Sequence, residues 1–216
     1  MKIVIPLYDN FTALDVIGPY EVLGKLPGAR TVFAGAERRV YKSDTPTLGI
    51  AAEMAFAEID SADVLLVGGT GHIAQVTANP PLIEFVKRIH PTTTWTTSVC
   101  TGALALAAAG VLDGVEAVTH WGAMDVLGRL GAIPVHERVV VRGKIVTGAG
   151  VSAGIDMALT LAAKIAGEAF ARALQLALEY DPQPPFDAGS PAKAGPELVK
   201  IVAELMAPAM AAPPTP

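Results

Sequence analysis

The stretch TTTWTTSVCTGALALAAAG, residues 92–110, joins a β-branched segment directly to one rich in alanine and leucine. The first segment predicts a strand over residues 93–99, and the second predicts a helix over residues 101–109 that ends at Gly110. Cys100 lies at the junction, with no loop between the strand and the helix. Such a sharp turn is typical of layered α/β structures, and it pushes the residue at the turn out of the sheet plane.

Strand-like and helix-like segments alternate along the rest of the chain. We expect β-rich segments at residues 2–8, 30–35, 39–51, 63–69 and 139–147, with turns at 43–46 and 142–143. We expect helices at residues 13–26, 80–89, 152–166 and 169–180, the first divided into two pieces by Pro19 and the third capped by Ser152. An irregular loop is expected over residues 181–191, which include four prolines. The alternation predicts one α/β domain over residues 1–207, with helices on both faces of a mostly parallel sheet, and a disordered tail over residues 208–216.

Composition excludes several classes of function. The net charge of -5 comes from 21 acidic and 16 basic residues spread along the chain, so no basic stripe is present to bind nucleic acid. No apolar run is long enough to span a membrane, and the apolar start of the chain is too short for a signal peptide. A single cysteine excludes an internal disulfide, which leaves the cytoplasm as the expected location.

Cys100 is the candidate nucleophile. At the start of a helix, the dipole and the free N–H groups stabilise a thiolate and lower the thiol pKa. The N–H of Thr101 is in place to bind developing negative charge. The alternative interpretation is that Cys100 is a small apolar residue of the core and chemically inert. The spacing alone does not decide between a nucleophilic and an inert cysteine.

Asp15 is the candidate proton donor and acceptor. It follows the first predicted strand, so in a parallel sheet it emerges at the same edge as Cys100. Its apolar neighbours Leu14, Val16 and Ile17 predict partial desolvation, which raises a carboxyl pKa toward neutrality. An acidic residue that only complements the dipole of its own helix is the alternative.

Glycines and histidines supply the remaining candidates. Gly69 and Thr70, in VGGTGH, could offer backbone donors as an anion-binding nest, although glycines after a strand are more often turn residues. His120 and Val151 are candidates for the surroundings of the site, and a structural histidine is the commoner case. The four histidines are scattered without metal-ligand spacing, so we expect no metal site.

Several motifs together resemble the DJ-1/PfpI superfamily. They are LDVIGP (14–19), VGGTG (67–71), SVCTGALALAAAGVLDGVEAVTHW (98–121), LGAIPVHERVV (130–140) and TGAGVSAGIDMALTLAA (147–163). The resemblance implies a single-domain, flavodoxin-like sandwich with a cysteine nucleophile elbow, which is usually dimeric. Asp15 paired with Cys-Thr-Gly at the elbow, and the proline-rich segment 179–191, resemble the isonitrile hydratase branch.

This resemblance implies a cofactor-free hydration of isonitriles to N-substituted formamides. Cys100 would form a thioimidate, Asp15 would move protons, and Gly69 and Thr101 would supply backbone N–H groups. The peptidase and glyoxalase branches usually carry a histidine after the cysteine and a glutamate in the first motif, where this chain has Thr101 and Asp15. Val67 also replaces the proline often seen before the glycine pair.

Other activities remain as alternatives at this point. A DJ-1-like glyoxalase, or a redox-sensing or protective protein, would use the same cysteine, because an exposed thiolate of low pKa oxidises readily. The fold also forms the sensing half of AraC-type regulators, which carry a helix-turn-helix region after that domain. No such region follows here, so a regulator is not expected.

Overall fold

The computed structural model describes residues 1–210 of the chain. Within them, seven strands form one sheet in the order β10-β11-β7-β6-β1-β2-β5. These strands are β1 (Lys2–Leu7), β2 (Arg30–Gly35), β5 (Met54–Ala55), β6 (Val64–Val67), β7 (Trp95–Val99), β10 (Val139–Arg142) and β11 (Ile145–Gly148). Neighbours pair in parallel except β10 and β11, which form an antiparallel hairpin at one edge.

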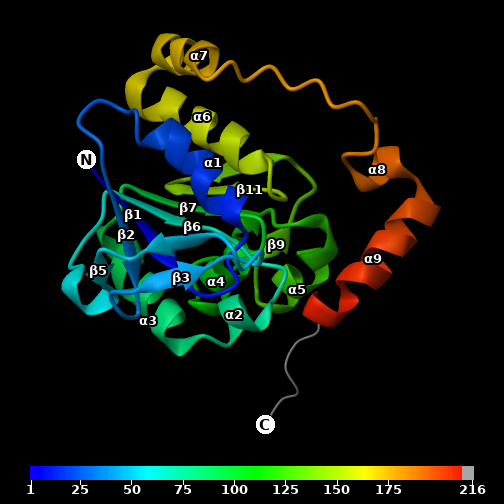
Figure 1. The fold of residues 1–216 in the computed structure, drawn as a ribbon, viewed down its shortest axis with the longest axis horizontal. Coiled ribbons are helices and arrows are strands. Elements are labelled where there is room, and N and C mark those ends of the chain that lie inside the picture. The colour runs from blue at the N-terminus through cyan, green and yellow to red at the C-terminus, as the bar shows by residue number, and fades with distance from the viewer. Residues whose placement is uncertain (211–216) are drawn as a thin grey trace.

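Helices cover both faces of the sheet (Figure 1). One face carries α1 (Ala13–Leu23) and α6 (Ala153–Ala166), and α7 (Glu168–Ala177) packs against α6 as an outer helix. The other carries α2 (Ala74–Thr77), α3 (Pro80–Ile89), α4 (Gly102–Ala108) and α5 (Met124–Arg129). Short 3₁₀ turns lie at Phe56–Glu58, His90–Thr92 and Trp121–Ala123. The predicted fold class, an α/β sandwich with a mostly parallel sheet, is therefore confirmed.

Two small strand pairs stand outside the main sheet. β3 (Val40–Lys42) pairs antiparallel with β4 (Gly49–Ala51), and β8 (Glu116–Ala117) pairs parallel with β9 (Ile133–Pro134). The turn predicted at residues 43–46 lies between β3 and β4. The turn predicted at Arg142-Gly143 joins β10 to β11, where Gly143 takes a φ of +56°.

The central strands and α4 form the core and carry the site. All residues of β6 are buried, as expected for a strand covered on both faces. Helix α4, which follows β7 after Cys100, is buried along nearly its whole length. The carboxyl ends of β1, β6 and β7 therefore meet at one edge, next to the start of α1 and α4.

Helix α1 differs from the prediction, because Pro19 does not divide it. Proline removes one helical hydrogen bond, at a typical cost of about 3 kcal/mol. Pro19 is nevertheless buried inside a continuous helix, where α1 packs against α6. A Cβ added at Gly154 of α6 would come within 3.0 Å of the Pro19 ring, so the two helices approach closely there. Packing between α1 and α6 thus outweighs the lost bond.

Ser152 also differs from its predicted role. It occupies the position before α6, but its side chain does not cap the helix. Its hydroxyl accepts a hydrogen bond from Arg138 at 3.3 Å instead. The partner of this hydroxyl is therefore the Arg138 guanidinium, from the connection between β9 and β10, and not an N–H group of the helix.

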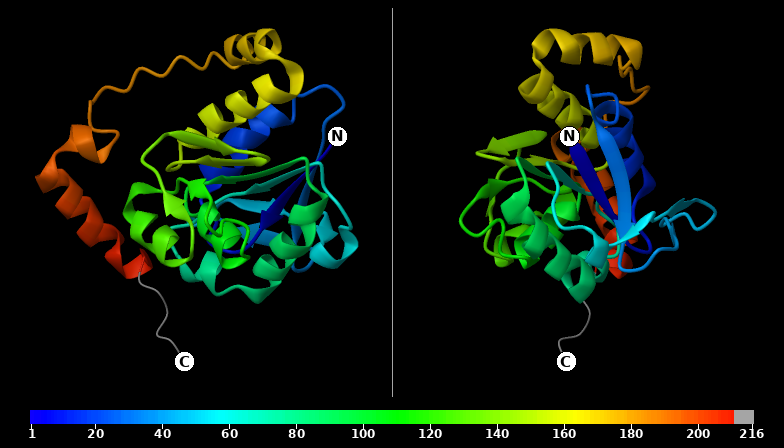
Figure 2. Two further views of the ribbon diagram at one scale, coloured as in Figure 1. Left: turned by 180° about the vertical axis from the view of Figure 1, so that it is seen from behind. Right: turned by 90° about the vertical axis from the view of Figure 1, so that its left-hand side faces the viewer.

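Residues 181–210 form a C-terminal arm beside the sandwich (Figures 1 and 2). The arm consists of an irregular segment followed by α8 (Pro191–Ala194) and α9 (Pro196–Met210). The predicted loop at 181–191 agrees with the irregular segment, but α9 was not expected and continues past the predicted boundary at residue 208. The remaining part of the predicted tail, residues 211–216, lies outside the described residues.

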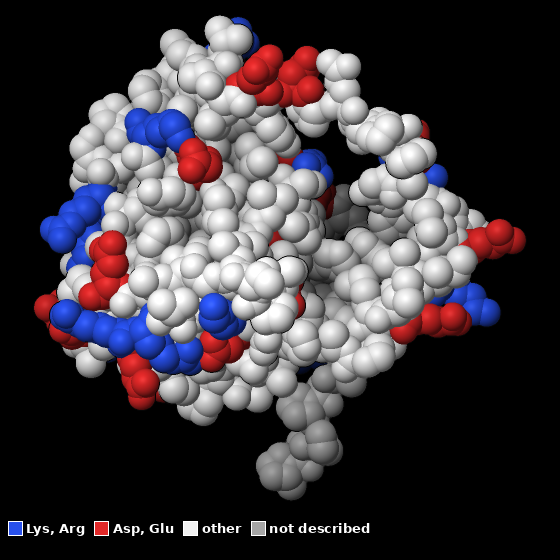
Figure 3. Space-filling view, viewed as in Figure 1, with Lys and Arg blue, Asp and Glu red and all other residues white. Residues whose placement is uncertain are grey.

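The molecular surface carries charges of both signs. On the face in Figure 3, Lys and Arg side chains lie interspersed with Asp and Glu, and a hollow separates the arm from the sandwich. This mixture agrees with the absence of a basic stripe in the sequence. No helix within residues 1–210 combines the length and the hydropathy needed to span a bilayer.

Candidate active site

Cys100 is held at the turn between β7 and α4 in a strained backbone conformation. Its φ is +57°, in the left-handed region that residues other than glycine rarely adopt. Its N–H donates to the carbonyl oxygens of Gly148 and Ala149, at 3.1 and 2.9 Å. Its own carbonyl accepts a hydrogen bond from the Thr119 hydroxyl at 2.8 Å. Contacts on both sides of the residue therefore determine the direction of the thiol.

The Asp15 carboxyl group lies beside the Cys100 thiol, as the shared sheet edge predicted. Oδ2 accepts a hydrogen bond from the N–H of Gly69 at 2.9 Å. Oδ1 is buried and has no hydrogen-bond partner within residues 1–210 at ordinary geometry. The thiol nonetheless lies close enough to act as a weak donor to the carboxylate. One carboxyl oxygen is thus held by the backbone, and the other is left for the reacting groups.

Burial raises the pKa of Asp15 to about 7, while the N–H of Gly69 and the Cys100 thiol act in the opposite direction. The side chain is fully buried, at 0% exposure, so water does not screen this effect. A carboxyl group with a pKa near neutrality is well matched to a role as general acid and base.

The pKa of the Cys100 thiol is raised, whereas the sequence predicted a lowered pKa. Burial and the Asp15 carboxylate raise the pKa of Cys100, while the N–H groups of Val151 and Thr101 lower it by hydrogen bonding to the sulfur. Because Cys100 is only 5% exposed, burial outweighs the helix start that was expected to lower this pKa. The raised pKa favours the thiol over the thiolate at this position.

Gly69 and Thr70 do not form the open anion nest that the sequence suggested. The N–H of Gly69 donates to Asp15, and the N–H of Thr70 donates to Thr101 Oγ1 at 2.7 Å. The Thr101 hydroxyl donates back to the Thr70 carbonyl at 2.6 Å. Both expected donors are thus used to hold the catalytic candidates, and the N–H groups that face the sulfur come from Thr101 and Val151.

A match to a known family agrees with this arrangement. The DJ-1/PfpI family model matches residues 1–164, which are most of the chain. The chain belongs to the DJ-1/PfpI family.

Individual relatives in the family extend the match over nearly the whole chain. "Isonitrile hydratase" from Pseudomonas putida is 39% identical over 204 residues, covering 94% of this chain and 89% of that protein. The crystal structure of a ThiJ/PfpI family protein from Pseudomonas syringae is 35% identical, with a TM-score of 0.88 over 97% of this chain and 88% of that one. Toxoplasma gondii DJ-1 is 21% identical, with a TM-score of 0.72 over 84% of this chain and 99% of that one, and shows the shared fold.

His120 lies next to the loop that carries the Val151 N–H. Its Nδ1 accepts from the N–H of Gly122 at 3.2 Å, and burial lowers its pKa, which favours the neutral imidazole. A Cβ added at Gly150 would lie 2.7 Å from His120 Cδ2, so the ring packs directly against this loop. His120 therefore supports the loop beside the thiol in this member of the DJ-1/PfpI family.

Sequence reasoning missed two residues of this site, Tyr8 and Thr119. The Tyr8 hydroxyl donates to the carbonyl of Gly68 at 2.7 Å, next to the residue that binds Asp15. Burial first, then Asp15 and Cys100, raise the pKa of Tyr8 above its usual value, so the phenol stays protonated. The position of Tyr8 directly after β1, at the shared sheet edge, was the signal that could have found it.

Within residues 1–210, no group of three or more His, Cys, Asp or Glu side chains is arranged to hold a metal ion. The chemistry available to this site from its own residues is nucleophilic attack by sulfur and proton transfer by a carboxyl group.

Proposed function

We propose that this protein hydrates isonitriles to N-substituted formamides, with Cys100 as the nucleophile and Asp15 as the general acid and base. The proposal rests above all on a buried carboxyl group with a pKa of about 7 beside the single cysteine of the chain. The 39% identity to an isonitrile hydratase over 94% of the chain supports the same reaction. No cofactor takes part in the proposed chemistry.

In the first half-reaction, sulfur adds to the terminal carbon of the isonitrile. Asp15 takes the thiol proton as the S–C bond forms, and then delivers it to the same carbon, which gives a thioimidate, Cys100-S–CH=N–R. The N–H groups of Val151 and Thr101 stabilise the sulfur while it carries negative charge. Because its pKa is about 7, Asp15 can both take and return a proton near neutral pH, and formation of the S–C bond offsets the cost of deprotonating a thiol whose pKa is raised.

In the second half-reaction, water attacks the thioimidate carbon. Asp15 takes a proton from the water and passes it to the nitrogen, which gives the tetrahedral adduct Cys100-S–CH(OH)–NH–R. The C–S bond then breaks as Asp15 takes the remaining hydroxyl proton and returns it to the sulfur, which releases R–NH–CHO and leaves Cys100 as a thiol. The sum is one isonitrile and one water converted to one formamide, with Asp15 and Cys100 returned to their starting states.

The other uses of this cysteine receive less support. Redox sensing requires an accessible thiolate of low pKa, whereas Cys100 is buried and its thiol pKa is raised. A glyoxalase activity is tested directly by methylglyoxal consumption in the same preparation.

The test of the proposal measures formamide production from a simple alkyl isonitrile. We expect turnover by the wild type, and loss of turnover in Cys100→Ala and Asp15→Asn. Asp44→Asn is the matched control, because Asp44 is exposed, raises the pKa of Asp15 through its charge and makes no hydrogen bond to the Asp15 side chain within residues 1–210. Methylglyoxal consumption without formamide production would overturn the proposal.

We also propose a homodimer that acts in the cytoplasm. The exposed apolar side chains of the arm, including Leu198, Ile201 and Leu205, support self-association. The absence of any cysteine pair supports a reducing location. Light scattering during gel filtration tests the first statement, and fractionation of the native cells tests the second.

A further inference from the structure

One peptide group, between Gly68 and Gly69, connects Tyr8 to Asp15. Its carbonyl oxygen accepts from the Tyr8 hydroxyl at 2.7 Å, and its N–H donates to Asp15 Oδ2 at 2.9 Å. Tyr8 is 4% exposed and Asp15 is fully buried, so both bonds lie in a largely desolvated environment. The two bonds therefore act on opposite ends of a single amide dipole.

Donation to an amide oxygen polarises the amide and makes its N–H a stronger donor. We propose that Tyr8 is a positioning residue for Asp15, whose hydroxyl orients the Gly68–Gly69 peptide and strengthens the N–H that binds the carboxylate. This inference rests on the proposed role of Asp15 as the acid and base.

The tight packing around this peptide adds to its orienting effect. A Cβ at Gly68 would lie 2.9 Å from Val16, and a Cβ at Gly69 would lie 2.5 Å from the nitrogen of Thr101. The peptide thus fits closely between α1 and the start of α4 and can shift little. Loss of the Tyr8 hydroxyl would remove the side-chain donor that the Gly68 carbonyl has in this structure.

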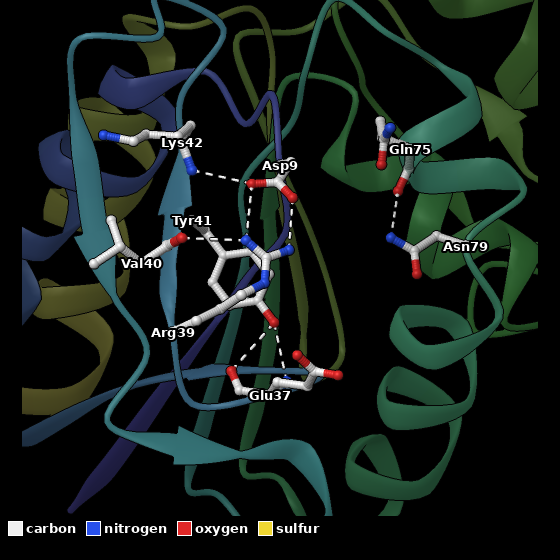
Figure 4. Close-up of polar contacts among 8 residues, drawn as sticks. All are labelled: Asp9, Glu37, Arg39, Val40, Tyr41, Lys42, Gln75 and Asn79. Carbon is white, nitrogen blue, oxygen red and sulfur yellow. Dashed lines mark hydrogen bonds and ion pairs between the residues drawn. The ribbon is translucent and has the colours of Figure 1, made fainter.

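Tyr41 provides a matched control for Tyr8. Both rings line a cavity of about 240 Å³ at the carboxyl ends of β1 and β2, and Tyr41 is 3% exposed. The Tyr41 hydroxyl binds the backbone of Glu37, and the Arg39 guanidinium lies 3.8 Å above its ring (Figure 4). Tyr41→Phe therefore removes a similarly buried hydroxyl that is not bonded to the peptide holding Asp15.

The experiment uses the single cysteine as a reporter. Iodoacetamide alkylates Cys100 alone, and the rate should rise as Asp15 ionises and becomes able to accept the thiol proton. We expect the midpoint of this rise to move to higher pH by roughly half a unit in Tyr8→Phe, about a threefold change in the acid dissociation constant. Tyr41→Phe should leave the midpoint at its wild-type value. An unchanged midpoint in Tyr8→Phe, or an equal shift in Tyr41→Phe, would overturn the inference.

A second variant tests the inference without deleting the hydroxyl. Replacing Tyr8 with 3-fluorotyrosine makes the phenol a stronger donor and keeps the packing, so the variant remains informative if Tyr8→Phe does not fold. The midpoint should then move to lower pH. A midpoint that stays in place or moves upward contradicts the inference.

These measurements separate the inference from the proposed reaction. If the wild type makes no formamide from isonitriles but the alkylation midpoints shift as expected, the hydratase proposal fails and the role of Tyr8 stands. If formamide is produced and the midpoint is insensitive to Tyr8, only the role of Tyr8 fails.

Discussion

The turn around Cys100 and the C-terminal arm are opposite extremes of this molecule. Helix α4, Gly102–Ala108, is short and almost wholly buried, whereas the longer α9, Pro196–Met210, has no buried residue. Polar groups around Cys100 are bonded to backbone atoms from several elements. Two cavities, of about 310 and 130 Å³, lie between the arm and the sandwich, and Trp121 lines both of them.

This difference shows where the chain can tolerate change. Around Cys100, hydrogen bonds to Gly69, Thr70 and Thr119 and close packing hold the carboxyl, thiol and amide groups in one arrangement, as the proposed proton transfer requires. The arm presents apolar side chains such as Leu205, which is 75% exposed, to whatever lies beside it. Substitutions at the turn should therefore alter chemistry and stability, and substitutions in the arm should alter neither within one subunit.

Removal of Cys100, the proposed nucleophile, should produce the largest effect. In Cys100→Ala we expect the rate of formamide production to fall by about 10⁴-fold or more, because no other cysteine is available to form the thioimidate. Leu205→Ala in the arm is the control and should keep the wild-type rate. A Cys100→Ala enzyme that retains a tenth of the activity would show that sulfur does not form the covalent bond.

The raised pKa of Asp15 predicts an unusual dependence of stability on pH. The carboxyl pKa rises from 3.8 when unfolded to about 7 when folded, so the folded state binds the proton more tightly. The free energy of unfolding should therefore fall between about pH 4 and pH 7, by roughly 3–4 kcal/mol relative to Asp15→Asn, and change no further above that range.

Urea unfolding of the two proteins from pH 4 to pH 8.5 measures this difference. Comparing them removes the opposite contribution of groups such as Asp9 and Glu58, whose pKa values are lowered by arginine partners. A wild type that gains stability over Asp15→Asn as the pH rises would show that the carboxylate is stabilised in the fold.

Adding a methyl group at Gly69 in the turn region, or at Gly189 in the arm, should change the free energy of unfolding by very different amounts. A Cβ at Gly69 would lie 2.5 Å from the nitrogen of Thr101, whereas a Cβ at Gly189 in the arm would meet no atom of the described residues within 4 Å. We expect Gly69→Ala to lower the free energy of unfolding by about 3 kcal/mol, and Gly189→Ala to change it by about 0.5 kcal/mol or less. Equal effects in chemical denaturation would contradict the contrast.

The smallest effect is expected for a polar substitution on the exposed face of α9. Leu205→Ser should change the stability of an isolated subunit by about 0.5 kcal/mol or less, since the side chain is already mostly in water. In the proposed dimer the same change should weaken association. Sedimentation at several protein concentrations distinguishes these effects, and an unchanged dimer would remove Leu205 from the proposed interface.

Much of the fold and part of the site followed from local patterns. The buried run of β6, the helix at Pro80–Ile89 and the turn that carries Cys100 were all visible in sequence. The convergence of Asp15 and Cys100 followed from the rule that parallel strands end at one edge. The continuity of α1 did not, because the contact between Pro19 and Gly154 joins distant segments.

The sequence by itself determined the alternation of strands and helices, the turn that carries the cysteine, and the carboxyl group that shares its edge of the sheet. Tertiary structure alone decided that the thiol pKa is raised, that Gly69 and Thr70 bind Asp15 and Thr101, and that Tyr8 reaches the same peptide. Periodicity and residue type act over a few neighbouring positions. Desolvation and the choice of hydrogen-bond partner depend instead on every segment packed around a group, and those segments come from distant parts of the chain.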